Sequence, residues 1–285
     1  SSLKFIYSLN EDYKDAIIET LSPNATSIGL CNLYKASKYY AKIEYIIKNK
    51  KQSIETTFET TDLGPRVMYA EGVYNIRDLG GYIGLGGKRT KQGLIYRGGA
   101  LTDSTDSHYD SWVDITESGK ECMSDLMKIK SEFDLRNREE SFNLVESPIP
   151  GASLTYFPLN AYTKAFTETT RFANLFRALS VKDNYPIYMH CTGGADRTGT
   201  VSFLFNALLG VCESDLIHDY EFTTFSIYGE RNSREGTYYD FYNFYQKLKA
   251  DYQGDTLAKK VENYLLSIGV TQEEINNIRA IMLDD

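Results

Sequence analysis

The segment PIYMHCTGGADRTGTV, residues 186–201, decides the fold. A short apolar run ends at His190 and Cys191, two glycines follow, and a second apolar run begins after an Asp-Arg pair. Apolar runs on either side of a glycine-rich turn predict a strand, a loop and a helix. Such a unit directs backbone N–H groups and the positive end of a helix at one point, and this arrangement binds a phosphate-sized anion.

The flanking sequence continues the same alternation of strands and helices. Short strands are predicted over residues 94–97, 131–136, 154–159 and 186–190, and helical spacing begins at 167 and 201. Glycines cluster at 78–93, which predicts a loop-rich entry, and later helices are expected to end at Gly210 and Gly269 and to begin at a capping box of Thr271 with Glu274. We therefore expect an α/β fold, a mostly parallel central sheet flanked by helices.

The first 64 residues have a different pattern. Side chains alternate between apolar and polar along residues 39–48 and again along 52–60, with KNKKQ between them as a hairpin connection. This pattern predicts a small all-β sandwich domain in residues 1–64. The sequence DLGPR at 62–66 has the Gly-Pro punctuation of a linker, so we place the second domain at residues 65–285.

Composition limits the function classes. The chain has 285 residues, 42% of them hydrophobic, and a formal charge of −8, which argues against a membrane span and against binding of nucleic acid through a broad basic surface. Its four cysteines are too scattered for a disulfide framework or a zinc site. The chain begins Ser1-Ser2 rather than with Met, which indicates a trimmed form that could have lost an export signal.

Cys191 is the residue with the strongest chemical setting. Loop amides, the helix end and Arg197 all favour thiolate over thiol, so the pKa of Cys191 should be lowered. A thiolate there can attack a bound phosphate ester and form a phosphocysteine that water hydrolyses, with Arg197 gripping phosphate oxygens and Thr198 assisting the sulfur. We interpret Gly193 and Gly194 as positions of positive φ and His190 as a brace for the loop. The alternative for Cys191 is a small buried hydrophobe, the expected state of the other three cysteines, which are Cys31, Cys122 and Cys212.

The segment HCTGGADRTG resembles the His-Cys-(five residues)-Arg-Thr/Ser-Gly signature of cysteine-dependent protein tyrosine phosphatases. VYNIRDLGGY (73–82), GLIYRGGAL (93–101) and FDLRNREE (133–140) extend the resemblance to the atypical bacterial members over residues 70–285. It implies a cysteine-phosphatase fold with Cys191 as nucleophile, Arg197 as clamp and a cradle of loop amides that includes Thr192, Gly193, Gly194 and Ala195. Relatives that accept phosphoinositides carry Lys where this chain has Ala195, which favours a compact soluble phosphoester. Residues 1–64 resemble a fibronectin type III or immunoglobulin-like module.

A carboxylic acid should protonate the leaving group and later activate water. The resemblance implies Asp196 for this role, whereas Asp134, at the predicted end of a neighbouring strand, is a second candidate. A structural partner of Arg197 is the alternative for Asp196, and a strand-end hydrogen-bond acceptor is the alternative for Asp134. Four further residues either line the pocket or form scaffold ion pairs: Arg77, Asp78, Arg97 and Arg136. Arg231 and Arg234 either reach a second anionic group or lie in a solvated loop.

We therefore expect a phosphomonoester hydrolase, most similar to a protein tyrosine phosphatase, that needs no metal or cofactor and acts on a phosphotyrosine protein or a small phosphoester. An inositol polyphosphate phosphatase and a catalytically idle phosphate-binding or adhesion module are the alternatives. We expect a secreted or cell-surface protein, or otherwise a cytoplasmic one, with a surface partner for the β domain.

Overall fold

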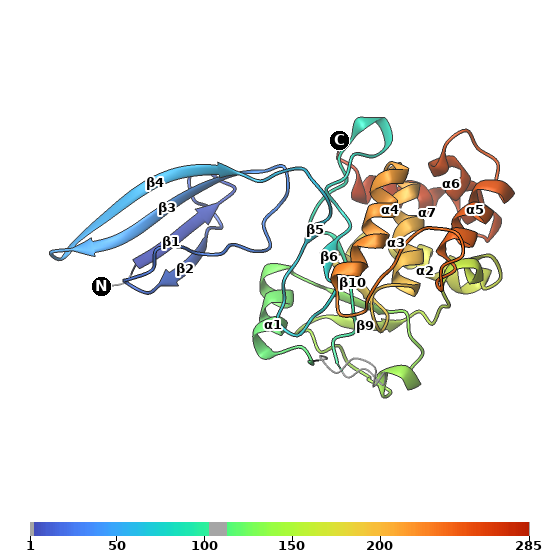
Figure 1. The fold of residues 1–285 in the computed structure, drawn as a ribbon, viewed down its shortest axis with the longest axis horizontal. Coiled ribbons are helices and arrows are strands. Elements are labelled where there is room, and N and C mark those ends of the chain that lie inside the picture. The colour runs from blue at the N-terminus through green and yellow to red at the C-terminus, as the bar shows by residue number, and fades with distance from the viewer. Residues whose placement is uncertain (1–2, 103–112, 285) are drawn as a thin grey trace. The chain divides into compact units, whose positions relative to one another are not determined.

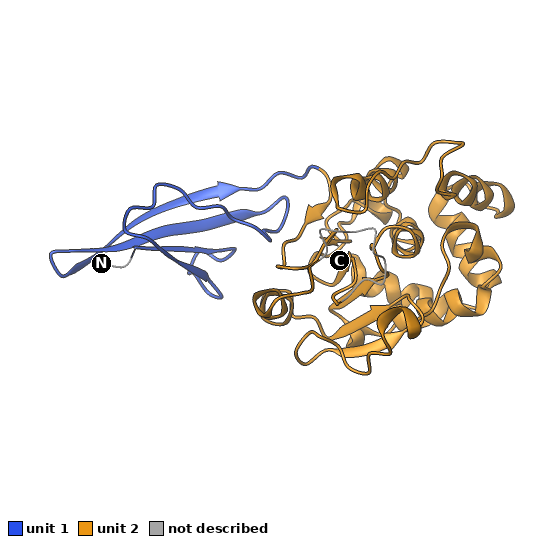
Figure 2. Ribbon diagram, turned by 60° about the horizontal axis from the view of Figure 1, so that its bottom comes forward, with its two compact units in different colours: residues 1–63 blue, residues 64–285 orange. Residues whose placement is uncertain are grey.

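The computed structural model describes residues 3–102 and 113–284 of the chain. The chain divides into two compact units, residues Ser1–Leu63 and Gly64–Asp285 (Figure 2). Each unit is described below by itself.

Unit 1 forms an antiparallel sheet with the strand order β2-β1-β3-β4. The strands are β1 (Leu3–Ser8), β2 (Ile17–Leu21), β3 (Lys38–Ile47) and β4 (Lys50–Glu59). The hairpin between β3 and β4 turns on Lys48 and Asn49 alone, both with positive φ, at 50° and 61°. These two values match the tight hairpin turn that suits the twist of paired strands, so the connection is shorter than the predicted KNKKQ.

The described residues of unit 1 contain one sheet and not the two packed sheets of the predicted sandwich. Its small core consists of Tyr7, Tyr39 and Ala41, with Leu30 and Leu33 of a loop packed against them. Nearly every residue of β4 is exposed. The period-two pattern was a correct sign of strands, but a sheet face covered by a loop produces the same pattern as one covered by a second sheet.

Unit 2 is built on a mixed sheet with the order β5-β6-β7-β10-β8-β9 among the described residues. The strands β7, β10, β8 and β9 pair in parallel, whereas β5 and β6 add an antiparallel edge. The bounds are β5 (Arg66–Val67), β6 (Arg77–Asp78), β7 (Ile95–Gly98), β8 (Ser131–Asp134), β9 (Ser153–Tyr156) and β10 (Ile187–His190). The four strands predicted from the sequence are therefore confirmed, and they form the parallel part of the sheet.

Helices cover both faces of this sheet (Figure 1). The larger core lies between the sheet and α2 to α7, and it receives Ile187 and Met189 of β10. Tyr188, which points the other way, joins a second core that includes Met123 of the helical turn Cys122–Leu126 after α1. The helices are α1 (Glu117–Glu121), α2 (Thr169–Leu179), α3 (Arg197–Leu208), α4 (Glu213–Glu221), α5 (Phe241–Asp251), α6 (Leu257–Ser267) and α7 (Gln272–Met282).

Helix α3 is the central helix, and every residue from Thr198 to Leu208 is buried. Gly210, with φ of 82°, ends it by donating its N–H to the Ala207 carbonyl. The predicted helix end at Gly210 and the predicted capping box at the start of α7 are both confirmed. In the part of the chain that the structure describes, no helix has the length and apolar character needed to cross a membrane.

Candidate active site

Cys191 lies at the carboxyl end of β10, the strand that pairs with β7 on one side and β8 on the other. It is the first residue after the strand, and α3 begins six residues later at Arg197. Its side chain is buried, with 3% of the residue exposed. The predicted strand, loop and helix are therefore confirmed, and the loop of residues 191–196, here called the phosphate loop, is fixed at both ends.

The carbonyl groups of the phosphate loop are held outward by hydrogen bonds from other segments. The donors are His190 Nδ1 to the Cys191 oxygen (3.1 Å), the Ala100 N–H to the Thr192 oxygen (2.8 Å), Asn75 Nδ2 to the Gly193 oxygen (2.9 Å) and Arg97 Nη2 to the Gly194 oxygen (2.6 Å). Because C=O and N–H of a trans peptide point in opposite directions, the N–H groups are turned inward. Within the described chain, the N–H groups of residues 192–195 donate to no protein acceptor. The loop thus presents a set of uncommitted donors suited to a tetrahedral oxyanion.

The two glycines of the loop have different functions. Gly194 has φ of 62°, and a Cβ there would lie 2.1 Å from the Gly98 carbonyl oxygen of β7. Gly193 does not have a positive φ, so the expectation of positive φ at both positions is wrong for Gly193. A side chain at Gly193 would instead crowd a neighbouring ring, since its Cβ would lie 3.0 Å from Tyr228, closer than an ordinary van der Waals contact. Ala195, the next residue, is 1% exposed.

The surroundings of Cys191 favour its thiolate. Burial alone would raise the pKa of the thiol, but the charge of Arg197 and hydrogen bonds from the Thr198 hydroxyl and N–H outweigh it and lower the pKa. The Thr198 hydroxyl is buried and has no other hydrogen-bond partner among the described groups. The sulfur is therefore its acceptor, and the bond stabilises the negative charge of the thiolate.

Arg197 is held in place by Glu140, a residue of the short helix Glu139–Ser141 that follows β8. Arg197 Nη1 lies 2.8 Å from Glu140 Oε2, and Nη2 lies 3.4 Å from the Thr192 hydroxyl oxygen. Burial alone would lower the pKa of Arg197, but the negative charges of Cys191 and Glu140 raise it by more, so the net shift is upward. The guanidinium therefore stays charged beside the sulfur and is fixed in orientation by a carboxylate.

Asp196, the last residue of the phosphate loop, is gripped by two remote segments. Arg231 forms a bidentate pair with it, from Nε to Oδ1 at 2.7 Å and from Nη2 to Oδ2 at 3.1 Å, and the Tyr162 hydroxyl donates to Oδ1. The Asp196 side chain is still 31% exposed. Arg234, three residues after Arg231, is exposed and is not brought to Asp196.

Asp134, the second candidate acid, is at the end of β8 and is 1% exposed. Arg136 forms a bidentate pair with it, at 3.0 Å to Oδ1 and 2.7 Å to Oδ2, and is itself buried. Burial raises the pKa of Asp134, but the charges of His190 and Arg136 and the hydrogen bonds from Arg136 lower it more strongly. Asp134 is thus kept as a carboxylate, the form that cannot donate a proton.

A buried network beneath Cys191 connects His190 to Glu132. His190 Nε2 is 2.8 Å from Glu132 Oε1, and the Ser147 hydroxyl donates to Glu132 Oε2 at 2.5 Å. Burial lowers the pKa of His190, but Asp134 and Glu132 raise it, so both ring nitrogens can donate. Glu132, Asp134 and His190 have ligand atoms within 4.8 Å of one another, as metal ligands do. Each of the three is engaged in the hydrogen bonds already described, which brace the loop.

Arg77 and Arg97, expected either to line the pocket or to form scaffold pairs, are both 0% exposed. Arg77 Nε and Arg97 Nη1 bind the two carboxylate oxygens of Asp219 at 2.7 and 2.5 Å. Asp78 is also 0% exposed and accepts hydrogen bonds from Arg66, Gly80 and Gly93. All of these contacts correspond to the scaffold alternative, and Arg97 also supports the loop directly through the Gly194 oxygen.

Reasoning from the sequence missed several residues that shape the site. Glu140 contacts Arg197 and Tyr162 contacts Asp196, and neither was singled out from the sequence, whereas Arg231, which was named with two open alternatives, pairs with Asp196. Tyr228 covers Gly193, Asp219 neutralises two buried arginines, and Asn75 anchors the loop. Glu140 stood inside the quoted FDLRNREE segment and Asn75 inside the quoted VYNIRDLGGY segment, and these were the local signals. The others come from distant segments of sequence and are brought together by the fold.

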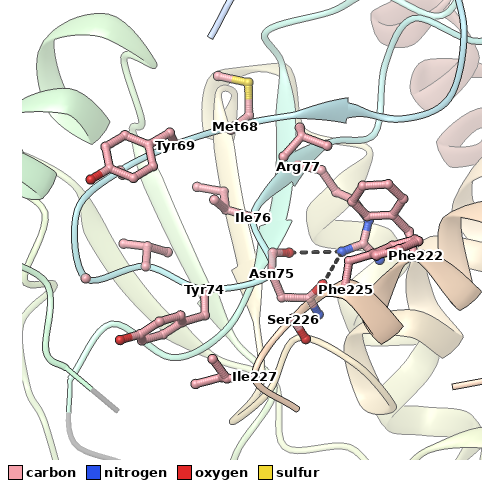
Figure 3. Close-up of a pocket in the computed structure, with 14 residues that line it drawn as sticks. Met68, Tyr69, Tyr74, Asn75, Ile76, Arg77, Phe222, Phe225, Ser226 and Ile227 are labelled. Atoms are coloured by element: carbon pink, nitrogen blue, oxygen red, sulfur yellow. Dashed lines mark hydrogen bonds between the residues drawn. The ribbon is translucent and has the colours of Figure 1, made fainter. Parts of the chain in front are cut away.

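A cavity of about 420 Å³ lies in unit 2, and Asn75 is among the residues that line it (Figure 3). Its lining is mostly apolar and comes from residues 67–77 and 222–227, with Tyr69, Tyr74, Phe222 and Phe225 among its side chains. Neither the phosphate loop nor Arg197 contributes a residue to this lining. Asn75 connects the two places, because it lines the cavity while its amide nitrogen donates to the Gly193 oxygen.

Comparisons with known proteins agree with this site. Residues 68–284 match the model of the tyrosine phosphatase family. A Cupriavidus necator protein provisionally named a tyrosine-protein phosphatase is 29% identical over 175 residues, which cover 52% of this chain and 59% of that protein. A Nostoc commune tyrosine-protein phosphatase is 25% identical over 126 residues, which cover 38% of this chain and 43% of that protein. The chain thus spans about half the length of these curated relatives.

Among solved structures, the chain is similar to the core catalytic domain of the PP-IP phosphatase SIW14 from S. cerevisiae in complex with citrate. It is 15% identical, with a TM-score of 0.34, over 57% of this chain and 92% of that one.

Proposed function

Because the chain belongs to the tyrosine phosphatase family, we propose that it hydrolyses phosphomonoesters through a phosphocysteine formed on Cys191. The observation that carries the proposal is the joint arrangement of sulfur and loop. A thiol with a lowered pKa stands at a loop whose carbonyls are tied outward and whose N–H groups at residues 192–195 are uncommitted. Preorganised donors of this kind stabilise the charge of a transferring phosphoryl group without having to reorganise.

The reaction we propose has two steps. In the first, Cys191 Sγ forms a bond to phosphorus as the bond to the leaving oxygen breaks, and Asp196 gives that oxygen a proton. In the second, water attacks the phosphocysteine while Asp196 takes its proton, and the sulfur leaves as a thiolate stabilised by Arg197 and Thr198. Both carboxylates pair with an arginine, and we favour Asp196 because its side chain is 31% exposed and can meet a leaving oxygen and water, whereas the Asp134 side chain is 1% exposed.

A compact substrate such as a phosphotyrosine side chain suits the site better than a densely phosphorylated ring. The carboxylate of Glu140 contacts Arg197. Its negative charge beside the phosphate loop disfavours a substrate that carries further phosphates. Ala195 supplies no charge and is buried. Inositol polyphosphate hydrolysis, the enzyme alternative, would need more unpaired positive charge around the loop.

The fibronectin type III or immunoglobulin-like character of residues 1–64 and its surface partner stay predictions. A secreted or cell-surface location is proposed on the same ground, since it is the setting in which such a module would meet a partner. The antiparallel sheet of unit 1 supports the all-β character of the module but not the two packed sheets of those folds.

A panel assay in the presence of a chelator tests the proposal. The purified chain is compared on phosphotyrosine peptide, phosphoserine peptide, inositol hexakisphosphate and a phosphoinositide, with Cys191→Ser as the control. We expect fastest release of phosphate from the phosphotyrosine peptide and none from the control. Faster hydrolysis of inositol hexakisphosphate would replace the substrate class, and no hydrolysis with tight vanadate binding would indicate an idle binding module.

A further inference from the structure

Every side-chain nitrogen of Arg231 donates a hydrogen bond. It is 4% exposed, and its guanidinium carbon lies 3.5 Å from the centroid of the Tyr239 ring. Its Nη1 donates to the carbonyls of Tyr228 and Glu230, at 3.1 and 3.0 Å. Its Nε and Nη2 are directed to the two oxygens of Asp196. A planar fork with a fixed stacking partner holds a carboxylate in one plane far better than a flexible ammonium group would.

The same segment also covers the phosphate loop. Tyr228 is three residues before Arg231, and its ring lies against Gly193. The Arg231 backbone is tied to the Thr224 hydroxyl in both directions, at 3.0 Å each. Arg231 therefore organises its own turn through Nη1 and orients the last residue of the phosphate loop through Nε and Nη2. It is separated from Asp196 by 35 residues in the sequence.

The Asp196 carboxylate is the group that Arg231 and Tyr162 orient. Its Oδ1 accepts from Arg231 Nε and from the Tyr162 hydroxyl, and its Oδ2 accepts from Arg231 Nη2. Tyr162 is itself fixed, because its hydroxyl is 2.8 Å from that of Tyr220 and the ring is almost fully buried. Burial and the Asp196 charge raise the pKa of Tyr162, so it remains a donor. The carboxylate is thus restricted to one orientation while part of it faces solvent.

We propose that Arg231 is a positioning residue for catalysis, which sets the direction in which Asp196 exchanges a proton with the leaving oxygen and with the attacking water. This inference rests on the proposed function, since it requires Asp196 to act as the acid. It does not require Arg231 to touch the substrate. A displacement of about 1 Å in a catalytic group can cost about 100-fold in rate, and general acid catalysis contributes about 10²–10⁴-fold.

A leaving-group series distinguishes positioning from a merely structural effect. The kcat/KM is measured for aryl phosphates whose phenols range from strongly to weakly acidic, with wild type, Asp196→Asn, Arg231→Gln and the double variant. We expect Arg231→Gln to slow the weakly acidic phenols about 30–100-fold and the strongly acidic ones by less than about 3-fold. We expect the double variant to be no slower than Asp196→Asn, and Arg231→Lys to recover only part of the loss.

Arg234→Gln is the matched control, since it removes the same charge from the same segment at an exposed position. We expect it to match wild type across the series, and vanadate affinity to be unchanged in Arg231→Gln because the loop amides are intact. If Asp196→Asn steepens the leaving-group dependence but Arg231→Gln slows all substrates equally, the inference is wrong and the proposed mechanism survives. The same holds if the double variant is slower than Asp196→Asn by the full effect of Arg231→Gln. If Asp196→Asn itself shows no leaving-group dependence, the proposed acid is wrong and the inference fails with it.

Discussion

Gly194→Ala is the substitution that most directly tests the geometry of the phosphate loop. An alanine at φ of 62° costs about 1–2 kcal/mol for the left-handed backbone alone. Its Cβ would also lie 2.1 Å from the Gly98 oxygen, a backbone atom of β7 that cannot swing aside. Overpacking of this kind typically adds about 1–3 kcal/mol. We therefore expect a total loss of about 2–5 kcal/mol in the free energy of unfolding.

Relief of the clash has to move the loop by about 1 Å away from β7, which separates the Gly194 oxygen from Arg97 and tilts the inward N–H groups. We expect the affinity for orthovanadate, measured by calorimetry, to fall at least about tenfold. The unfolding free energy is measured from urea titrations followed by circular dichroism.

Gly151→Ala is a matched control for this prediction. Gly151 has φ of 79°, and a Cβ there would meet nothing within 4 Å. Only the backbone cost of about 1–2 kcal/mol should remain, with vanadate affinity unchanged. The reasoning would be refuted by a Gly194→Ala protein that equals Gly151→Ala in both stability and vanadate affinity.

Three further predictions concern charge. Arg197→Lys keeps the charge but loses the planar fork, and it should lower kcat/KM for an aryl phosphate about 10²–10³-fold; a loss below threefold contradicts the clamp. Thr198→Val should shift the pH midpoint of Cys191 alkylation by iodoacetamide upward, because a hydrogen bond that lowers the pKa is removed; a midpoint at the wild-type pH would count against that bond. Asp219→Asn should lower the free energy of unfolding by about 3–5 kcal/mol, because two buried arginines lose their shared counter-charge, whereas Asp215→Asn on the same helix should change it little.

The sequence was sufficient for the strand, the phosphate loop and the helix around Cys191 because their signals are local. The apolar run of β10, the two glycines and the apolar run of α3 are each recognised from residues within a few positions of one another. Gly210 likewise marks the end of α3 locally. The same local signals located β7, β8 and β9 and the capping box of α7.

The ion-pair partners that come from distant segments could not be predicted from the sequence. Arg77 and Arg97 look like candidates to bind an anion until the fold brings Asp219 to them from 142 and 122 residues away. Likewise, nothing near Asp196 in the sequence indicates that Arg231 will grip it. For the same reason the sandwich prediction for unit 1 was too specific, since alternation along β3 reports that one face is covered and not what covers it.

The most direct test of the central claim is detection of the covalent intermediate. The chain is mixed with an aryl phosphate in the presence of a chelator, quenched in acid within the first turnover, digested and analysed by mass spectrometry. Wild type, and more strongly Asp196→Asn if it slows the second step, should carry one phosphoryl group on the peptide that contains Cys191. Cys191→Ser should show neither the modified peptide nor turnover. Turnover that survives Cys191→Ser, or a phosphoryl group found on another residue, would contradict the account.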